Sequence, residues 1–394
     1  MVDFLIIGGG IIGLNIAIEI KKLKPNATVM VLEKEPEVGM HSSGRNSGVL
    51  HAGFYYTADS LKAKFTREGN AQLREFCYSR GLNINECGKV VVASSEKELD
   101  ALEELKRRGD TNGVDLQWRS EKNIEKEYPN IKTYKKALYS PSTATVDPRE
   151  VTKEFAKYAE ELGVLVRYNA KYLGRADNDS ISINDDIIKY KKLINSAGLY
   201  ADKIANDFGF SKNYTIIPFK GIYLKDSRNL SSLVTNVYPV PNLSNPFLGV
   251  HYTLTVDKEA KIGPTAIPAF WRENYRGFDN FSFKEFMQII YYESKLFMGN
   301  SFGFRLLAIE EIKKYRESYL LNLAKKLTRN MDHSGYDRWS TPGIRAQLLD
   351  KRTLELVQDF IVERDEKSVH ILNAVSPAFT SSIPFAKWIV KKML

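Results

Sequence analysis

Residues 4–13, FLIIGGGIIG, decide the fold expected of this chain. The apolar run FLII predicts a short strand that ends in a glycine turn, and the pattern of residues 11–23 predicts a helix. In the turn, Gly8 permits a tight bend, Gly10 lets the backbone approach a pyrophosphate, and Gly13 lets helix and strand pack closely. The helix N-terminus then offers N–H groups and a partial positive charge to phosphates.

An acidic residue follows the second strand, where a nucleotide-binding fold requires one. Residues 28–32, TVMVL, predict that strand, and Glu33 comes directly after it. A carboxylate here accepts hydrogen bonds from ribose hydroxyls and repels a 2′-phosphate. A glycine-rich turn alone is a weak indication, but strand, turn, helix and acid together predict a bound dinucleotide.

The next segment favours FAD over NAD. A nicotinamide-binding fold usually continues with alternating strands and helices, whereas residues 41–56 read HSSGRNSGVLHAGFYY. We therefore expect FAD in a Rossmann-like domain, within an α/β (α+β) fold. Antiparallel strand patterns over residues 214–270 predict a second, substrate-binding domain. The expected boundaries make both domains discontinuous: 1–85, 145–213 and 341–394 for the FAD-binding domain, and 86–144 and 214–340 for the substrate domain.

The composition is that of a soluble globular protein, with 43% hydrophobic and 27% charged residues. Cys77 and Cys87 form no CxxC pair, so we expect neither a disulfide framework nor a metal site, and the location expected is cytoplasmic. The net charge of +9 favours an anionic substrate or a peripheral contact with the inner face of a membrane. Nucleic acid is disfavoured because no recognised nucleic-acid module accompanies the charge.

Residues 282–328 have a helical pattern with a stripe of Phe, Ile, Leu and Tyr. We expect this stripe to face the core or a second copy of the chain rather than a membrane. The final segment predicts a helix after SPAFTSS, with Ser381 or Ser382 as its N-cap and Pro384 in its first turn.

Several stretches resemble the FAD-dependent L-2-hydroxyglutarate dehydrogenase/oxidase family, within the D-amino-acid-oxidase-like flavoenzymes. The resemblance implies tightly held FAD and oxidation of a small L-2-hydroxy acid, here L-2-hydroxyglutarate, to the 2-oxo acid. It also implies hydride transfer to flavin N5 and electron delivery to a quinone or oxygen. The matching stretches are NSGVLHAGFYY (46–56), SLKAKF (60–65), NSAGLYAD (195–202), YPVPN with PFLGVHYT (238–253), GIRAQLLD (343–350) and SPAFTSS (376–382).

The glycine motif and the resemblance together assign residues to the cofactor. A helix N-terminus after SPAFTSS is suited to the negative charge of reduced flavin, although an ordinary terminal helix would have the same sequence. The expected cofactor-binding residues are Gly8, Gly10, Ile11, Ile12, Gly13, Glu33, Lys34, Ser43, Gly44, Arg45, Asn46, Ser47, Gly48, Ala197, Gly198, Ser376, Pro377, Thr380 and Ser381.

Oxidation of an alcohol requires a base for the hydroxyl proton, and the chain has five histidines. His51 and His251 match family histidines, and we expect one of them to be the catalytic base. A structural role is the alternative for each. His41 is expected to order the loop that contains it.

Substrate binding requires positive charge for the carboxylate. Arg345 offers a planar fork that lysine lacks, although a structural ion pair with an acid such as Asp350 is an equal alternative. Arg45, within residues 41–56, is a second cation. The distal end of the substrate is assigned to Lys220, Tyr223 and Tyr252.

Five positions depart from the family pattern and leave the substrate open. The family usually has histidine at Arg45, an acid at Ile222, asparagine at Thr265, lysine at Trp271 and alanine at Phe379. The alternatives are therefore a flavin oxidoreductase of the same fold that acts on another hydroxy acid or on an amine, and a non-catalytic flavin-binding protein.

Overall fold

The computed structural model describes residues 1–184, 186–228, 232–241 and 249–394. Residues 242–248, which belong to one of the family-like stretches, lie outside the described residues. The chain forms two compact units, called unit 1 and unit 2 below. Unit 1 comprises residues 1–46, 148–218 and 344–394, and unit 2 comprises residues 47–147 and 219–343.

Unit 1 is built on a sheet whose central strands are parallel. β1 (Val2–Ile7) lies between β12 (Asp186–Asn195) and β2 (Val29–Leu32), and β2 pairs in parallel with β9 (Leu165–Arg167). Residues 4–7 of β1 are a continuous apolar run because such a strand is covered on both faces. The sheet is extended beyond β12 by β10 (Tyr172–Asp177), β11 (Ser180–Ile183), β22 (Ile361–Arg364) and β23 (Ser368–Asn373).

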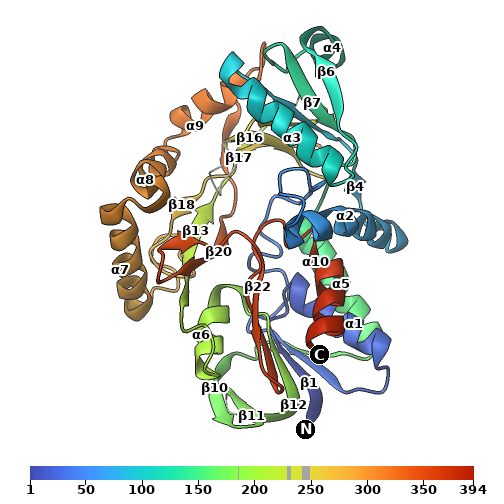
Figure 1. The fold of residues 1–394 in the computed structure, drawn as a ribbon, viewed down its shortest axis with the longest axis vertical. Coiled ribbons are helices and arrows are strands. Elements are labelled where there is room, and N and C mark those ends of the chain that lie inside the picture. Colours follow the sequence, from blue (N-terminus) through green and yellow to red (C-terminus); the bar gives the residue numbers. More distant parts are fainter. Residues whose placement is uncertain (185, 229–231, 242–248) are drawn as a thin grey trace. The chain divides into compact units, whose positions relative to one another are not determined.

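Helices cover the two faces of this sheet. α1 (Ile11–Leu23) packs against α5 (Pro148–Glu161) and α10 (Ser382–Met393), whereas α6 (Ala201–Asp207) packs against β12 and β23. Figure 1 shows the first three helices on one side of the sheet and α6 on the other. The helix expected over residues 11–23 is confirmed.

Unit 2 contains an eight-stranded sheet with two buried faces. β5 (Lys89–Val92) has Val90 and Val92 in one hydrophobic cluster and Val91 in another, because successive side chains alternate between faces. The strand order is β19 (Tyr336–Trp339), β14 (Leu224–Asp226), β17 (Ala260–Gly263), β16 (His251–Leu254), β15 (Asn236–Pro239), β5, β7 (Lys136–Ser140) and β6 (Gln117–Ser120).

The remaining strands are short or carry the chain between units. A three-stranded sheet of unit 2 contains β3 (Val49–Leu50), β8 (Ala144–Val146) and β4 (Ile84–Asn85). In unit 2, β18 (Ile267–Pro268) pairs with residues 219–220, and in unit 1, β21 (Glu355–Leu356) pairs with residues 349–350. The unit boundaries lie within β13 (Tyr214–Gly221) and β20 (Gly343–Asp350).

The helical region expected over residues 282–328 is divided into three. α7 (Phe283–Gly299) ends where Asn300 adopts a left-handed conformation, and α8 (Phe304–Lys313) and α9 (Glu317–Ala324) follow. The other helices of unit 2 are α2 (Leu61–Ser79), α3 (Leu99–Thr111) and α4 (Glu121–Glu127).

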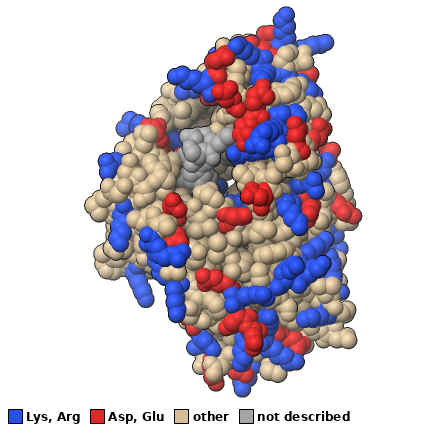
Figure 2. Space-filling view, in the orientation of Figure 1, with Lys and Arg blue, Asp and Glu red and all other residues tan. Residues whose placement is uncertain are grey.

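The apolar stripe of α7 and α8 is not wholly covered within the chain, so only part of it faces the core, and contact with a second copy of the chain stays a prediction for the rest. α7 buries Ile289 and Leu296 but exposes Phe283, Met287 and Tyr291. Positions four residues apart share one face of a helix, so these three side chains form one exposed stripe. Figure 2 shows the corresponding side of the molecule as largely uncharged atoms with Lys and Arg among them.

The mixed helix-and-sheet fold expected from the sequence is confirmed. The compact units divide the chain after residue 46, whereas the expected FAD-binding domain continued to residue 85. Residues 47–85 lie in unit 2 because β3 and β4 pair with β8 there.

Candidate functional site

Two positions at the junction of β1 and α1, one in the turn and one in the first turn of the helix, accept only glycine. Gly8 has φ of +107°, and a Cβ there would lie 2.6 Å from the Ser196 carbonyl oxygen. A Cβ on Gly13 would lie 2.1 Å from the Gly8 carbonyl oxygen. Helix and strand backbones therefore approach as closely as the motif predicted.

The N-terminus of α1 is suited to a phosphate group. Gly10 occupies the N-cap position in an extended conformation and supplies no capping side chain, and the first turn contains no acidic residue. The Ile11 N–H donates to the Ser43 Oγ at 3.0 Å, so the expected cofactor residue Ser43 lies directly beside this turn. Backbone N–H groups and the helix dipole favour an anion here, and Ile12 belongs to the same turn.

Glu33 is buried at the end of β2. Its Oε2 accepts from the Gly9 N–H at 3.1 Å and its Oε1 accepts from the Glu35 N–H at 3.0 Å. Burial raises the pKa of this carboxyl, and the hydrogen bond from Glu35 acts in the opposite direction. A Cβ on Gly9, which the motif spacing leaves unassigned, would lie 3.0 Å from Glu33 Oε2 and would crowd the carboxylate.

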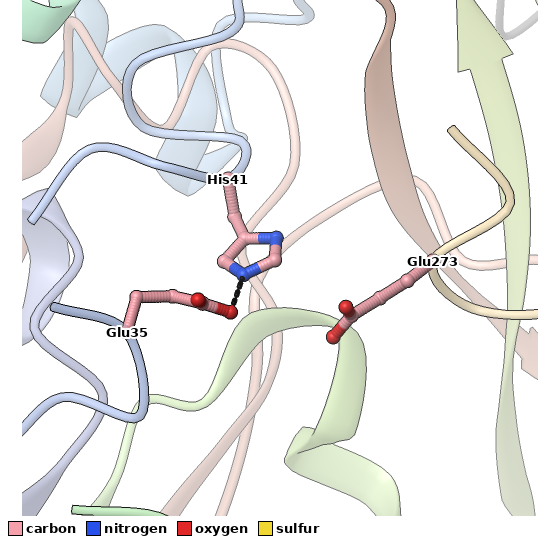
Figure 3. Close-up of side chains that lie close together, drawn as sticks. All are labelled: Glu35, His41 and Glu273. Carbon is pink, nitrogen blue, oxygen red and sulfur yellow. Dashed lines mark hydrogen bonds and ion pairs between the residues drawn. The ribbon is translucent and has the colours of Figure 1, made fainter. Parts of the chain in front are cut away.

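The loop that follows is held by local polar contacts. The His41 imidazole contacts the Glu35 carboxylate, with 2.9 Å between Nε2 and Oε1, as Figure 3 shows. His41 and Lys34 lower the pKa of Glu35 to about 2. The Lys34 Nζ donates to the same oxygen at 2.6 Å. These contacts support the loop-ordering role expected of His41. Glu273, also drawn in Figure 3, belongs to unit 2.

The rest of this loop is closely packed. A Cβ on Gly44 would lie 2.0 Å from the Gly39 carbonyl oxygen, and the Asn46 side-chain amide donates to the Ser42 and Ser43 carbonyls. Arg45 is half-buried in the same loop. The loop is fixed to β20 because the Ser42 hydroxyl donates to the Ile344 carbonyl at 2.8 Å.

Two further segments of unit 1 were expected to contact the cofactor. Ala197 and Gly198 follow Ser196, whose hydroxyl donates to the Ile7 carbonyl at 3.0 Å beside the glycine turn. Before α10, Ser376 is exposed, whereas Pro377, Thr380 and Ser381 are buried. Ser381 occupies the N-cap position of α10 and Pro384 lies in its first turn, as predicted, although the Ser381 side chain makes no capping hydrogen bond.

The two candidate bases lie in unit 2 and differ in burial. His51 is half-buried, and its carbonyl accepts from the Asn70 side-chain amide at 3.2 Å. His251 is 2% exposed at the start of β16, and its ring stacks on Tyr238 with 3.6 Å between ring centroids. Its Nδ1 lies 2.7 Å from the Gly249 carbonyl, which can only accept, so Nδ1 carries the hydrogen and Nε2 carries the lone pair.

Burial, with a smaller contribution from neighbouring lysines, determines the ionisation of His251. Burial lowers the pKa of His251 to about 3, and Lys89, Lys261 and Lys314 act in the same direction. Lys261 is itself buried, with its pKa lowered to about 8, and its Nζ donates to the Ser47 carbonyl at 3.0 Å. This bond places Ser47, and with it Gly48, beside Lys261.

The positions assigned to the distal end of the substrate have different environments. Lys220 is buried and its Nζ lies 3.4 Å from the Asn274 Oδ1, and burial lowers its pKa. Tyr223 is also buried, with the Lys261 Nζ 4.6 Å from its ring centroid. Thr265 Oγ1 donates to the Lys220 carbonyl at 2.9 Å.

Tyr252 is corrected to a core residue. It is fully buried in a hydrophobic cluster, and its hydroxyl lies 2.7 Å from His333 Nε2. Because neighbours on a strand point to opposite faces, Tyr252 and His251 lie on different faces of the sheet.

Arg345 lies on β20 and is half-buried. Its proposed structural partner, Asp350, is five residues further along the same strand, on the opposite face. Asp350 pairs instead with Arg352, with 2.6 Å between Nη2 and Oδ2, and Arg352 lowers its pKa to about 2.

The turn, the buried acid and the parallel sheet of unit 1 define a dinucleotide-binding fold. The model of the FAD dependent oxidoreductase family matches residues 3–392. The chain therefore belongs to this family, and its cofactor is FAD, as the sequence predicted. None of the helices in the described part of the chain has the length and apolar character needed to cross a membrane.

Relatives of similar length have a common name. The L-2-hydroxyglutarate dehydrogenase of Escherichia coli strain K12 is 34% identical over 100% of this chain and 93% of its own length. The mitochondrial L-2-hydroxyglutarate dehydrogenase of Homo sapiens is 35% identical over 99% of this chain and 88% of its own length. The family resemblance inferred from the sequence motifs is confirmed.

Solved structures show the same fold at lower identity. FAD-bound L-α-glycerophosphate oxidase from Mycoplasma pneumoniae is 23% identical, with a TM-score of 0.77 over 99% of this chain and 94% of that chain. Glycine oxidase from Geobacillus kaustophilus is 17% identical, with a TM-score of 0.70 over 100% and 94%. The family match makes the protein an FAD-dependent oxidoreductase.

Proposed function

We propose that this enzyme oxidises L-2-hydroxyglutarate to the 2-oxo acid, with His251 as the catalytic base. The observation that carries the proposal is the Nδ1 contact of His251 with the Gly249 carbonyl, which leaves the Nε2 lone pair to accept the hydroxyl proton. The full-length relatives named L-2-hydroxyglutarate dehydrogenase support the choice of substrate. FAD, when bound, accepts the hydride from the substrate carbon. His51 is the second candidate for the base.

The buried cations support a substrate with two carboxylates. Lys220 and Lys261 are both less than 10% exposed in unit 2, and an uncompensated buried ammonium favours a bound anion. We assign Lys220 to the distal carboxylate, with Arg345 on the α-carboxylate and Arg45 as an additional cation. A guanidinium suits the α-carboxylate because its planar fork fixes the orientation of the reacting carbon.

We assign the cofactor residues by their local chemistry. The Gly8–Gly13 turn would hold the pyrophosphate, and Glu33 would accept hydrogen bonds from the adenosine ribose. The start of α10, with Thr380 and Ser381 buried beside it, would face the negative charge that flavin gains on reduction. Unit 1 would therefore supply most of the FAD contacts.

The electron acceptor proposed is a membrane quinone, with oxygen as the alternative. More than half of the large hydrophobic side chains exposed in the described residues lie between residues 270 and 315. Phe283, Met287 and Tyr291 are each more than half exposed, with exposed cations Lys284 and Lys295 beside them. An exposed apolar face next to cations is suited to an anionic lipid surface at the inner face of a membrane.

Vesicle binding tests the membrane contact. The wild-type holoenzyme should co-sediment with phosphatidylglycerol vesicles, and the Phe283→Gln/Met287→Gln variant should not. If this face instead contacts a second copy of the chain, wild type will sediment as a dimer, the variant as a monomer, and neither will bind vesicles. That result would contradict the membrane contact.

One observation favours a different substrate, either another hydroxy acid or an amine. Ile222 stands where the family usually has an acid, and its N–H donates to Thr265 Oγ1 at 3.2 Å, so both departures lie in one place. Steady-state turnover with a dye acceptor distinguishes the classes. L-2-hydroxyglutarate should give the highest kcat/KM and release 2-oxoglutarate. A higher kcat/KM for L-malate, L-lactate or an amino acid would make that compound the substrate instead of L-2-hydroxyglutarate. If none of these compounds is turned over, a non-catalytic flavin-binding protein is favoured.

A further inference from the structure

Lys89, the first residue of β5, is a buried lysine that the proposed reaction does not use. Its side chain is 0% exposed, and its Nζ has no hydrogen-bond partner among the described residues. Three aromatic rings surround the ammonium, with 4.5 Å from Nζ to the Tyr238 centroid, 4.9 Å to Tyr55 and 5.2 Å to Phe54. Aromatic faces attract a cation, and they replace the carboxylate that a buried lysine ordinarily requires.

Strand pairing places Lys89 and His251 on one face of the sheet. Lys89 and Val91 share a face of β5, and Val91 pairs with Tyr238 on β15. Val237 pairs with Tyr252, so Tyr238 lies opposite His251 across the next antiparallel pair. The Tyr238 ring thus contacts both the ammonium of Lys89 and the imidazole of His251.

Among the described residues, the charged groups with the largest effect on His251 are lysines. Besides Lys89 on β5, they are Lys261 on β17 and Lys314 just after α8, and Lys314 pairs with Glu311. Burial lowers the pKa of Lys89 to about 7, and the Cys87 thiol acts in the opposite direction. Lys89 is therefore the one member of this group whose Nζ has neither a carboxylate nor a carbonyl partner among the described residues.

We propose that Lys89 is a positioning residue that holds the Tyr238 ring against His251 and adds its charge to the effect of burial in keeping the imidazole uncharged before substrate arrives. The inference rests on the proposed function in that His251 is the base. Like charge disfavours the imidazolium, so Nε2 retains its lone pair even in acidic solution. When a dicarboxylate binds near these lysines, its charge offsets theirs, and His251 becomes a stronger base only in the complex.

The test is the ionisation of His251 in the substrate-free holoenzyme, followed by NMR of ¹³C-labelled histidine and assigned with His251→Gln. Lys89→Met keeps the length of the side chain and removes the charge, so the pKa of His251 should rise by about one unit or more. Lys89→Arg retains the charge and should restore the low value. Lys136→Met is the matched control, because Lys136 lies over the Trp118 ring in unit 2 and should leave His251 unchanged.

The pH profile of kcat/KM separates this inference from the proposed function. In Lys89→Met the acidic limb should move to higher pH by the shift measured in the NMR titration. An unchanged pKa of His251 in a yellow, folded Lys89→Met or Lys89→Gln protein overturns the role of Lys89. A shifted pKa with an unmoved acidic limb overturns His251 as the base, and with it a part for Lys89 in the reaction.

Discussion

Single side chains of this enzyme take their chemistry from burial and from the atoms that fix their orientation. Glu33 is held by two backbone N–H groups, and His251 is held by a carbonyl and an aromatic ring. In His251 the fixed geometry leaves Nε2 for a ligand, whereas in Glu33 each carboxylate oxygen already accepts one backbone hydrogen bond. Substitutions that keep or remove the charge of a single side chain can therefore separate the effect of its charge from the effect of its geometry.

Replacing His251 tests its assignment as the catalytic base. His251→Gln should lower turnover by roughly 10²–10⁴ while the protein stays yellow and folded, because proton transfer loses its acceptor. His333→Gln is the control, since His333 contacts Tyr252 on the other face of the sheet. If His251→Gln turns over normally and His51→Gln does not, the base is His51.

Replacing Arg345 tests the grip on the α-carboxylate. Arg345→Ala should raise KM strongly with little change in melting temperature, and Arg345→Lys should recover only part of the affinity because it lacks the fork. Misplacing the reacting carbon by about 1 Å can also lower the rate on the order of a hundredfold. A large loss of stability with unchanged KM would show instead that Arg345 has a structural role.

Whether the sequence predicted an element correctly depended on how local its determinants were. The β1–turn–α1 segment was predictable because its strand, glycines and helix are consecutive. Tyr252 was assigned to the substrate because the sequence of a strand does not tell which of its two faces the core covers. Lys89 gave no signal, since its aromatic partners Phe54, Tyr55 and Tyr238 come together only through the pairing of β5 with β15 and the packing of residues 54–55.

The sequence could not predict whether the apolar stripe of α7 is covered, for a similar reason. Helical periodicity identifies an apolar face, but it does not tell whether that face meets a core, a second copy or a lipid surface. Burial shows that α7 packs through Ile289, Glu293 and Leu296 and leaves its other side exposed. The presence of a buried acid on the packed side was not expected from the sequence.

Glu293 makes the stability of unit 2 depend on pH. Burial raises its pKa to about 8, and its Oε1 has no partner in the part of the chain that the structure describes. The unfolded chain loses this proton near pH 4.5, so folding stability should fall as pH rises from about 4.5 to 8.

Glu293→Gln removes that dependence. The variant should be more stable than wild type by roughly 2–4 kcal/mol at pH 8 and equal to it at pH 4.5. Thermal melts at both pH values measure the difference, with Glu317→Gln, at an exposed position, as control. An equal gain at both pH values would mean that packing, rather than ionisation, accounts for the effect.

At the scale of the whole molecule, each compact unit is assembled from separate parts of the chain. Unit 1 uses three segments and unit 2 uses two, so the chain passes between units four times. The family match spans residues 3–392 and therefore includes both units. Enzymatic activity should therefore be tested on a holoprotein that contains both units.

An anaerobic titration of the purified yellow protein tests the central claim most directly. L-2-hydroxyglutarate should remove the absorbance of oxidised FAD at about one equivalent, because each substrate delivers one hydride, whereas the D enantiomer, L-glutamate and glycine should leave it unchanged. Flavin that stays oxidised with every 2-hydroxy acid tried, or that is reduced by an amino acid instead, would contradict the assignment of this chain as an L-2-hydroxy-acid oxidoreductase.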